Sequence, residues 1–316
     1  MTTTDLPTPP TSTVDADFFR WEEDHGAGVR VVRGRTAIHR VDAFQTIHTA
    51  SYEKVRELVP SDELHPARWF DGRGLVFVAA MRYRDVTTRD EAGTTLLLPP
   101  YAEVVVGVVL AADPEIPGLA PYGHPLRGFV LHMPVTTAVA AESGRTAYGF
   151  PAFVADLAFH DSPTRRCVTV TEGDHGILVL HASLHGHVHP DHAPVIMYSE
   201  LDGRLVETMG RFFGHRQTML RGGNGDLSLP GLHPVAERLR ELETDPAALV
   251  TVNHVDARLV LGPPVDVGAA QPYAGFVPAV EPRFGRYTVD YPDTPPLDQY
   301  AVPLDVRAVG APSPVG

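Results

Sequence analysis

Amine and thiol side chains are scarce in this chain of 316 residues. Of the 26 lysine and arginine residues taken together, only Lys54 is a lysine. Arginine keeps its proton at any working pH, so its side chain cannot serve as an amine nucleophile. Any mechanism that needs a reactive amine side chain must therefore use Lys54.

Cys167 is the single cysteine, which excludes an internal disulfide bond. It lies in the segment from Arg166 to Val170, whose residues are typical of a strand. The sequence places no base or helix start next to it that would lower the pKa of the thiol. We therefore favour a buried, inert thiol over a nucleophile.

Long apolar runs and an excess of cations are also absent. No run reaches the ~18 apolar residues of a membrane-spanning helix, and the formal net charge is −13. Because nucleic-acid binding rests on cations that neutralise phosphates, we expect neither a membrane nor a nucleic acid as a partner. Residues 1–13 lack the basic start and apolar core of a signal peptide, so we expect a cytoplasmic protein.

Composition divides the chain into three parts. We expect a disordered tail over residues 1–15, one domain over 16–268 and a proline-rich arm over 269–316. Aromatic residues such as Tyr273 and Phe284 punctuate the last part, which argues against plain disorder. We predict an extended arm that packs on its own domain or on a neighbouring subunit.

Short apolar segments bounded by Gly, Pro or Asp dominate the domain, and such segments predict strands. Helical patterns are few. Many strands with few helices favour a mainly antiparallel β domain, closed or nearly closed, with helices at its rim. The predicted strands cover residues 74–81, 101–110, 128–135, 166–170, 176–189 and 249–261, and the predicted helices cover 51–58, 134–146 and 233–242.

Two segments carry a resemblance to a known family. Residues 101–107 read YAEVVVG, and residues 144–153 read GRTAYGFPAF. They resemble the Y-x-E strand and the G-R-E-x-x-G-[FY]-P-K-K turn of the acetoacetate decarboxylase superfamily, and the likeness extends over residues 45–268. The resemblance implies an α+β, mainly antiparallel fold. It would be a cone-shaped β-barrel around a pocket, with a flanking sheet and a few helices, in a protein that is usually a homo-oligomer.

The sequence departs from the family at the residues that carry its chemistry. Decarboxylases of this family form a Schiff base on the first lysine of the K-K pair. Those two lysines correspond here to Ala152 and Phe153, which cannot form an imine. Lys54 lies on the exposed face of the helix predicted over 51–58. The sequence therefore predicts that the protein has no Schiff-base decarboxylase activity.

One family carboxylate is retained as Glu103, whereas the glutamate of G-R-E is replaced by Thr146. Tyr101 and Glu103 share one face of their strand, because side chains alternate. A carboxylate that faces a largely apolar pocket would have a raised pKa and would act as a general acid or base. The alternative is a surface glutamate at the start of a strand.

Three further side chains are candidates for the reaction. Arg145 would anchor a carboxylate or carbonyl oxygen by a bidentate contact, or it would clamp the Gly-Phe-Pro turn. Tyr148 would donate a hydrogen bond from its phenol, or it would serve only the structure. His132, expected on the opposite strand face from Leu131 and Met133, is either a pocket acid or base or a histidine of the barrel wall.

An apolar wall is expected around these groups, formed by Tyr101, Phe150, Pro151, Ala152 and Phe153. The replacement of two cations by alanine and phenylalanine makes the pocket less suited to a small anion, since ammonium groups attract carboxylates and aromatic rings do not. It favours a larger, apolar substrate.

Three alternating histidines, His185, His187 and His189, present a second possible site. Three imidazoles can bind zinc. However, alternate positions on one strand lie ~6.5–7 Å apart, so three rings hardly reach one ion unless the strand bulges. We favour a solvated or interface face and expect no metal and no other cofactor.

Taken with the resemblance, these residues favour an enzyme that works by acid–base chemistry without an imine. Its expected substrate is a carbonyl-containing, largely apolar small molecule, and its reaction a cyclisation, dehydration or isomerisation, in secondary metabolism. The main alternative is a noncatalytic small-molecule-binding protein on the same barrel. A metal-dependent enzyme that uses the histidine segment and a retained decarboxylase are the remaining alternatives.

Overall fold

The structure is a computed structural model that describes residues 20–24, 29–89, 95–114, 126–191, 194–220 and 224–270. The predicted tail over 1–15 and, apart from residues 269 and 270, the predicted arm over 269–316 lie outside the described residues. No helix in the described ranges has the length and apolar character that a bilayer crossing requires. The elements are β1 (Arg20–Asp24), β2 (Val29–Arg33), β3 (Thr36–Ala50), α1 (Tyr52–Arg56), β4 (Gly74–Arg89), β5 (Thr95–Leu98), β6 (Tyr101–Leu110), β7 (Leu126–Val135), α2 (Ala138–Tyr148), β8 (Ala152–Val154), β9 (Asp156–Phe159), β10 (Arg165–Glu172), β11 (His175–Ser183), β12 (Val188–Asp191), β13 (Pro194–Leu201), β14 (Arg204–Met219), β15 (Gly225–Ser228), α3 (Pro234–Glu241), β16 (Val250–Leu261) and β17 (Val265–Ala269).

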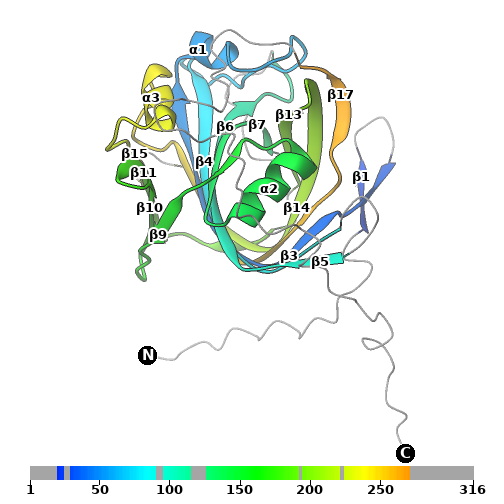
Figure 1. Cartoon of the computed structure of the whole chain (residues 1–316). Helices are drawn as coiled ribbons and strands as arrows, with labels where there is room; N and C mark the ends of the chain where they lie inside the picture. The colour runs from blue at the N-terminus through cyan, green and yellow to red at the C-terminus, as the bar shows by residue number, and fades with distance from the viewer. Residues whose placement is uncertain are drawn as a thin grey trace, which may run out of the picture.

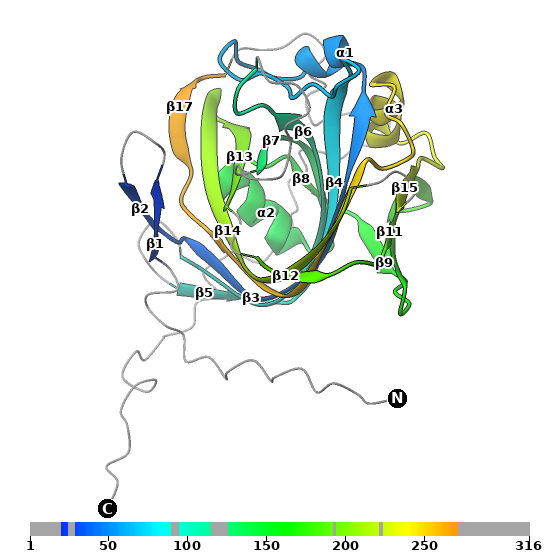
Figure 2. The same cartoon turned by 180° about the vertical axis from the view of Figure 1, so that it is seen from behind.

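The long strands close into a ring (Figures 1 and 2). Their order is β13-β7-β6-β4-β3-β16-β14, and β14 pairs with both β16 and β13, which closes the ring. Neighbouring strands of the ring run antiparallel, except that β13 and β7 are parallel. The predicted fold is confirmed: mainly antiparallel β structure, arranged as a ring, with few helices.

Alternating side chains give this ring an inner and an outer face. On β6, Val105 and Val109 belong to an apolar cluster that receives side chains from every strand of the ring, which identifies the inner face. Val104 and Val106 of the same strand belong to a different cluster, on the outer face. Helix α2 packs on β7, β8 and β13 and contributes to the inner cluster.

A second sheet, of order β15-β11-β10-β9, lies against the outer face together with α3 (Figure 1). Phe44 and Val78 of the ring pack there with Val168 and Leu180 of the second sheet. Burial of such side chains contributes about 1.5–3 kcal/mol each. This apolar contact holds the second sheet outside the ring.

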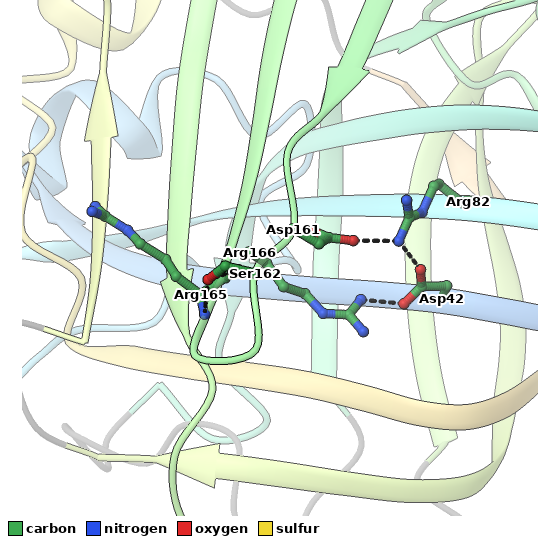
Figure 3. Close-up of polar contacts among 6 residues, drawn as sticks. All are labelled: Asp42, Arg82, Asp161, Ser162, Arg165 and Arg166. Carbon is green, nitrogen blue, oxygen red and sulfur yellow. Dashed lines mark hydrogen bonds and ion pairs between the residues drawn. The ribbon is translucent and has the colours of Figure 1, made fainter.

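An ion-pair cluster joins the edge of the second sheet to the ring (Figure 3). Asp42 on β3 accepts hydrogen bonds from Arg82 on β4 and from Arg166 on β10. Arg82 also donates to Asp161 at 2.5 Å, and its guanidinium carbon lies 4.8 Å from the centroid of the Phe159 ring. These charges lie on the outer face, so they stabilise the contact between the sheets and stay apart from the inner cluster.

Two predicted strands differ in the structure. The strand expected over 176–189 is divided into β11 and β12, which belong to different sheets, and Gly186 between them takes a φ of +96°. In β7, a register shift in the pairing with β6 breaks the alternation of side chains. As a result Leu131 and Met133, expected on one face, belong to different clusters.

The helix expected over 134–146 is displaced along the chain. Strand β7 extends to Val135, so α2 begins at Ala138 and runs on to Tyr148. It ends because Gly149 adopts a left-handed φ of +66°, a conformation that glycine takes without steric cost. The predicted helices over 51–58 and 233–242 are confirmed as α1 and α3.

Candidate active site

Glu103 is a buried carboxyl group on the inner face of the ring, with 8% of its surface exposed. It pairs across the strands with Met81 on β4 and Val135 on β7, both of which belong to the inner apolar cluster. The Oη of Tyr83 donates a hydrogen bond of 2.7 Å to its Oε1. Burial raises the pKa of Glu103 to about 7, against the smaller opposing effect of the Tyr83 hydrogen bond.

Two more tyrosines, Tyr101 and Tyr148, contribute to the inner cluster. The ring of Tyr101 meets that of Tyr83 edge to face at a centroid distance of 5.0 Å. Tyr148 on α2 stacks on Phe150 at 5.4 Å, and its Oη lies 2.6 Å from Thr36 Oγ1. Burial raises the pKa of Tyr148 to about 12, and burial together with Glu103 raises the pKa values of Tyr83 and Tyr101. All three phenols therefore keep their protons at neutral pH and are hydrogen-bond donors.

Arg145 makes local structural contacts. Its Nη2 donates to Glu142 Oε2 at 2.8 Å, one turn earlier on α2, and its Nη1 lies 3.4 Å from the carbonyl oxygen of Ala152. The first contact lies within α2, and the second ties α2 to β8 across the turn, as in the clamp interpretation. A role for Arg145 in anchoring a substrate stays a prediction.

The turn after α2 divides its residues between the two faces. Phe150 and Ala152 belong to the inner cluster, and Pro151 is half-buried between them. Phe153, expected on the same wall, belongs to the outer cluster and stacks on the ring of His233 at 5.8 Å. Consecutive strand residues face opposite sides. Of the two positions that carry lysine in the family, only that of Ala152 therefore faces the interior, as Glu103 does.

His132 does not join this site. It pairs with Val106, a residue of the outer cluster, so its side chain lies on the face opposite to Glu103. Burial, together with the charges of Arg238 and His233 at α3, lowers the pKa of His132 to about 3. A neutral histidine packed near α3 fits the wall interpretation rather than a pocket acid or base.

A histidine that the sequence analysis overlooked does lie on the inner face. His254 on β16 pairs with Ala43 and follows Val252 in the alternation, and both of those residues belong to the inner cluster. Its ring stacks on Phe212 at 4.1 Å, and its Nδ1 lies 3.0 Å from Oδ2 of Asp191. Inward alternation of residues 250, 252 and 254 is the signal that would have found His254; nothing local indicates its aspartate.

The histidine segment that precedes this aspartate is exposed. His185, His187 and His189 all have exposed side chains, and the first two precede β12. Within the described ranges, no three His, Cys, Asp or Glu side chains come together as metal ligands would. The exposed positions agree with a solvated face.

Lys54 and Cys167, which the sequence analysis considered as nucleophiles, lie outside the candidate site. Lys54 has a side chain that is 46% exposed, and its Nζ lies 2.9 Å from Glu243 Oε1, so the predicted surface position is confirmed. Cys167 is partly buried, and burial raises the pKa of its thiol. Neither of them belongs to the inner cluster.

The fold is shared with solved structures. An acetoacetate decarboxylase from Legionella pneumophila superposes with a TM-score of 0.52 at 15% identity, over 75% of this chain and 88% of that chain. The enduracididine biosynthesis enzyme MppR, solved in complex with pyruvate, gives a TM-score of 0.50 at 11% identity, over 74% of this chain and 91% of that chain. These identities support a common fold alone.

Sequence comparison assigns the family directly. No curated protein sequence matches the chain significantly. The family model described as acetoacetate decarboxylase matches residues 30–237, which include Glu103 and the turn after α2. This chain belongs to the acetoacetate decarboxylase family.

Proposed function

We propose that this protein catalyses acid–base chemistry on a carbonyl-containing, largely apolar small molecule without forming a Schiff base. The observation that carries the proposal is the buried Glu103, whose pKa of about 7 suits proton transfer in either direction at neutral pH. Cyclisation, dehydration and isomerisation are the reaction types that such a group serves. As further proposals, the protein is a homo-oligomer and acts in secondary metabolism.

Two positions argue against an imine. Ala152, at the place of the family's reactive lysine, is fully buried within the apolar inner cluster and carries no amine. Lys54, the one lysine of the sequence, is ion-paired at the surface. A substrate at Glu103 therefore meets no amine nucleophile from either residue.

The neighbouring phenols supply the other half of the chemistry. When Glu103 removes a proton from the carbon next to a carbonyl group, negative charge develops on the carbonyl oxygen. A neutral phenol of Tyr101 or Tyr148 would stabilise that charge by a hydrogen bond, which is stronger in an apolar surrounding than in water. Tyr83 stabilises the Glu103 carboxylate before the proton moves.

Deuterium exchange tests this proposal with a simple probe. Acetophenone is an apolar ketone, and exchange of its methyl protons in D₂O, followed by NMR, requires removal of a proton next to the carbonyl group. We expect the protein to accelerate the exchange and Glu103→Gln to lower the rate by about 10²- to 10⁴-fold. Glu57→Gln, at an exposed glutamate, is the matched control.

A noncatalytic binding protein on the same ring is the second candidate. It is favoured by the contacts of Arg145 with Glu142 and with the Ala152 carbonyl group. These contacts engage the guanidinium group that would otherwise anchor a substrate. In that case acetophenone and related ketones would show no accelerated exchange, and a bound ligand would be recovered unchanged after long incubation.

A further inference from the structure

A histidine and an aspartate from distant segments meet on the inner face of the ring. Asp191 is 1% exposed and His254 is 5% exposed, and 3.0 Å separates Oδ2 of the first from Nδ1 of the second. Asp191 pairs with Gly214 of β14, and His254 on β16 pairs with Arg216, two residues further along. The aspartate therefore reaches the histidine across a position that has no side chain.

The surroundings fix the orientation of this histidine. Phe212 stacks on the imidazole with an angle of 16° between the ring planes, so the ring cannot tilt freely. Arg216 Nη1 lies 3.8 Å from the other carboxylate oxygen of Asp191 and places a positive charge beside it. The contact between Nδ1 and Asp191 is a close approach of 3.0 Å that lacks hydrogen-bond geometry, and Nε2 is the nitrogen that remains for a ligand.

Glu103 and His254 occupy one row of the ring. His254 pairs with Ala43, Ala43 with Met81, and Met81 with Glu103. Three strand spacings of ~4.8 Å separate the two residues by about 14 Å along the sheet. Because the sheet curves into a ring and both residues lie on its inner face, the straight line between the two side chains is shorter than that path.

We propose that His254, oriented by Asp191, is a second proton-transfer group that acts on the same substrate as Glu103. This inference rests on the proposed function. In the forward step the Glu103 carboxylate takes the proton from the carbon next to the carbonyl group, and the bonding electron pair forms the new C=C bond. The C=O π electrons move to oxygen, which takes the proton from Nε2 of the imidazolium. An enol, a neutral imidazole and a protonated Glu103 result.

The alternative is a structural ion pair between β12 and β16. Such a pair would stabilise the ring without meeting a substrate. A reagent that resembles the probe and reacts with Nε2 separates the two possibilities, because it reports where the imidazole points and does not depend on turnover or on a substituted residue.

The experiment treats the folded Cys167→Ser protein with 2-bromoacetophenone and maps the adducts by peptide mass spectrometry. Nε2 attacks the CH₂ carbon, the C–Br bond breaks and bromide leaves. We expect saturable alkylation of His254, about 10-fold faster than alkylation of the exposed His187, and suppression of this reaction by acetophenone. Alkylation of His187 without His254 would overturn the proposal.

Proton exchange of acetophenone supplies the second measurement. We expect His254→Gln to lower the exchange rate about 100-fold and Asp191→Asn about 10-fold or more, with partial recovery in Asp191→Glu. Circular dichroism and the midpoint of thermal unfolding show that each variant is folded. For a positioning role, Asp191→Asn must also slow the alkylation of His254 while that of His187 is unchanged.

The two proposals fail in different ways. If His254→Gln exchanges acetophenone at the wild-type rate while Glu103→Gln does not, the role of His254 is refuted and the proposed function stands. If Glu103→Gln keeps the wild-type rate while His254→Gln loses it, Glu103 is not the base and the role of His254 is supported.

Discussion

Tyr83 donates a hydrogen bond of 2.7 Å to Glu103 from the neighbouring strand of the ring. Met81 and Val135, which pair with Glu103 across the strands, belong to the inner apolar cluster. Burial raises the pKa of Glu103 and the hydrogen bond lowers it, and burial has the larger effect. This balance places the pKa of Glu103 near neutral pH, where the carboxyl group can both take and give a proton.

Removal of the Tyr83 hydroxyl group tests this balance. In Tyr83→Phe the pKa of Glu103 should rise above about 7, by about one pH unit, because a hydrogen bond to a charged group is worth about 1.5–3 kcal/mol. The infrared band of the protonated carboxyl group, assigned by its loss in Glu103→Gln, measures the titration. Tyr52→Phe, on α1, should leave the band's midpoint unchanged; an unchanged midpoint in Tyr83→Phe would contradict the prediction.

The stability of the protein should fall as pH rises through neutrality. The pKa of Glu103 is raised from 4.5 to about 7, so the folded state holds the proton more tightly than the unfolded state. The resulting stabilisation is complete below pH 4.5 and is lost as pH rises through about 7, by about 3 kcal/mol. In urea unfolding at pH 5 and pH 8, Glu103→Gln should abolish this difference, whereas Glu57→Gln should retain it.

Borohydride trapping should yield no adduct. With acetoacetate as the keto acid, reduction of a Schiff base would add mass to a lysine peptide, but Ala152 offers no amine and the exposed Lys54 is ion-paired to Glu243. Intact-protein mass spectrometry after incubation with acetoacetate and borohydride should show the unmodified mass. A saturable adduct on Lys54 would refute the absence of Schiff-base chemistry.

The glycine that ends α2 should be among the least replaceable residues of the turn. A Cβ at Gly149 would lie 2.3 Å from the carbonyl oxygen of Glu200, and φ there is +66°. Gly149→Ala should therefore lower the free energy of unfolding by about 3 kcal/mol or more. Gly173→Ala is the matched control, because its φ is +54° and nothing lies within 4 Å of the added carbon. Equal losses in the two variants would contradict the steric explanation.

Local patterns predicted much of the fold. The apolar run over 101–110 is β6, and the helix expected over 233–242 is α3. The first is a continuous apolar run bounded by proline and aspartate, which is typical of a strand buried on both faces, and the second is amphipathic with the helical spacing of about 3.6 residues. The prediction of one strand over 176–189 was wrong, because composition does not show that Gly186 redirects the chain there.

The candidate site was predicted only in part. Glu103 and Ala152 were expected at the interior and belong there, whereas Phe153 and His132 lie on the outer face. For Phe153, the alternation of side chains along β8 would have been enough to predict the outer face. For His132, the face depends on a register shift between β6 and β7, and local sequence does not specify which residues pair across strands.

The sequence by itself determined that no amine stands at the family's reactive position and that Lys54 is the one lysine in the chain. It also determined that a carboxylate lies within an apolar strand, since both statements need only residue identity and alternation. Only the tertiary structure decided that Tyr83 meets Glu103 and that Asp191 meets His254. Those pairs join strands that are distant in sequence, and their contact depends on the closure of the ring, which buries both pairs and gives the carboxyl group of Glu103 its raised pKa.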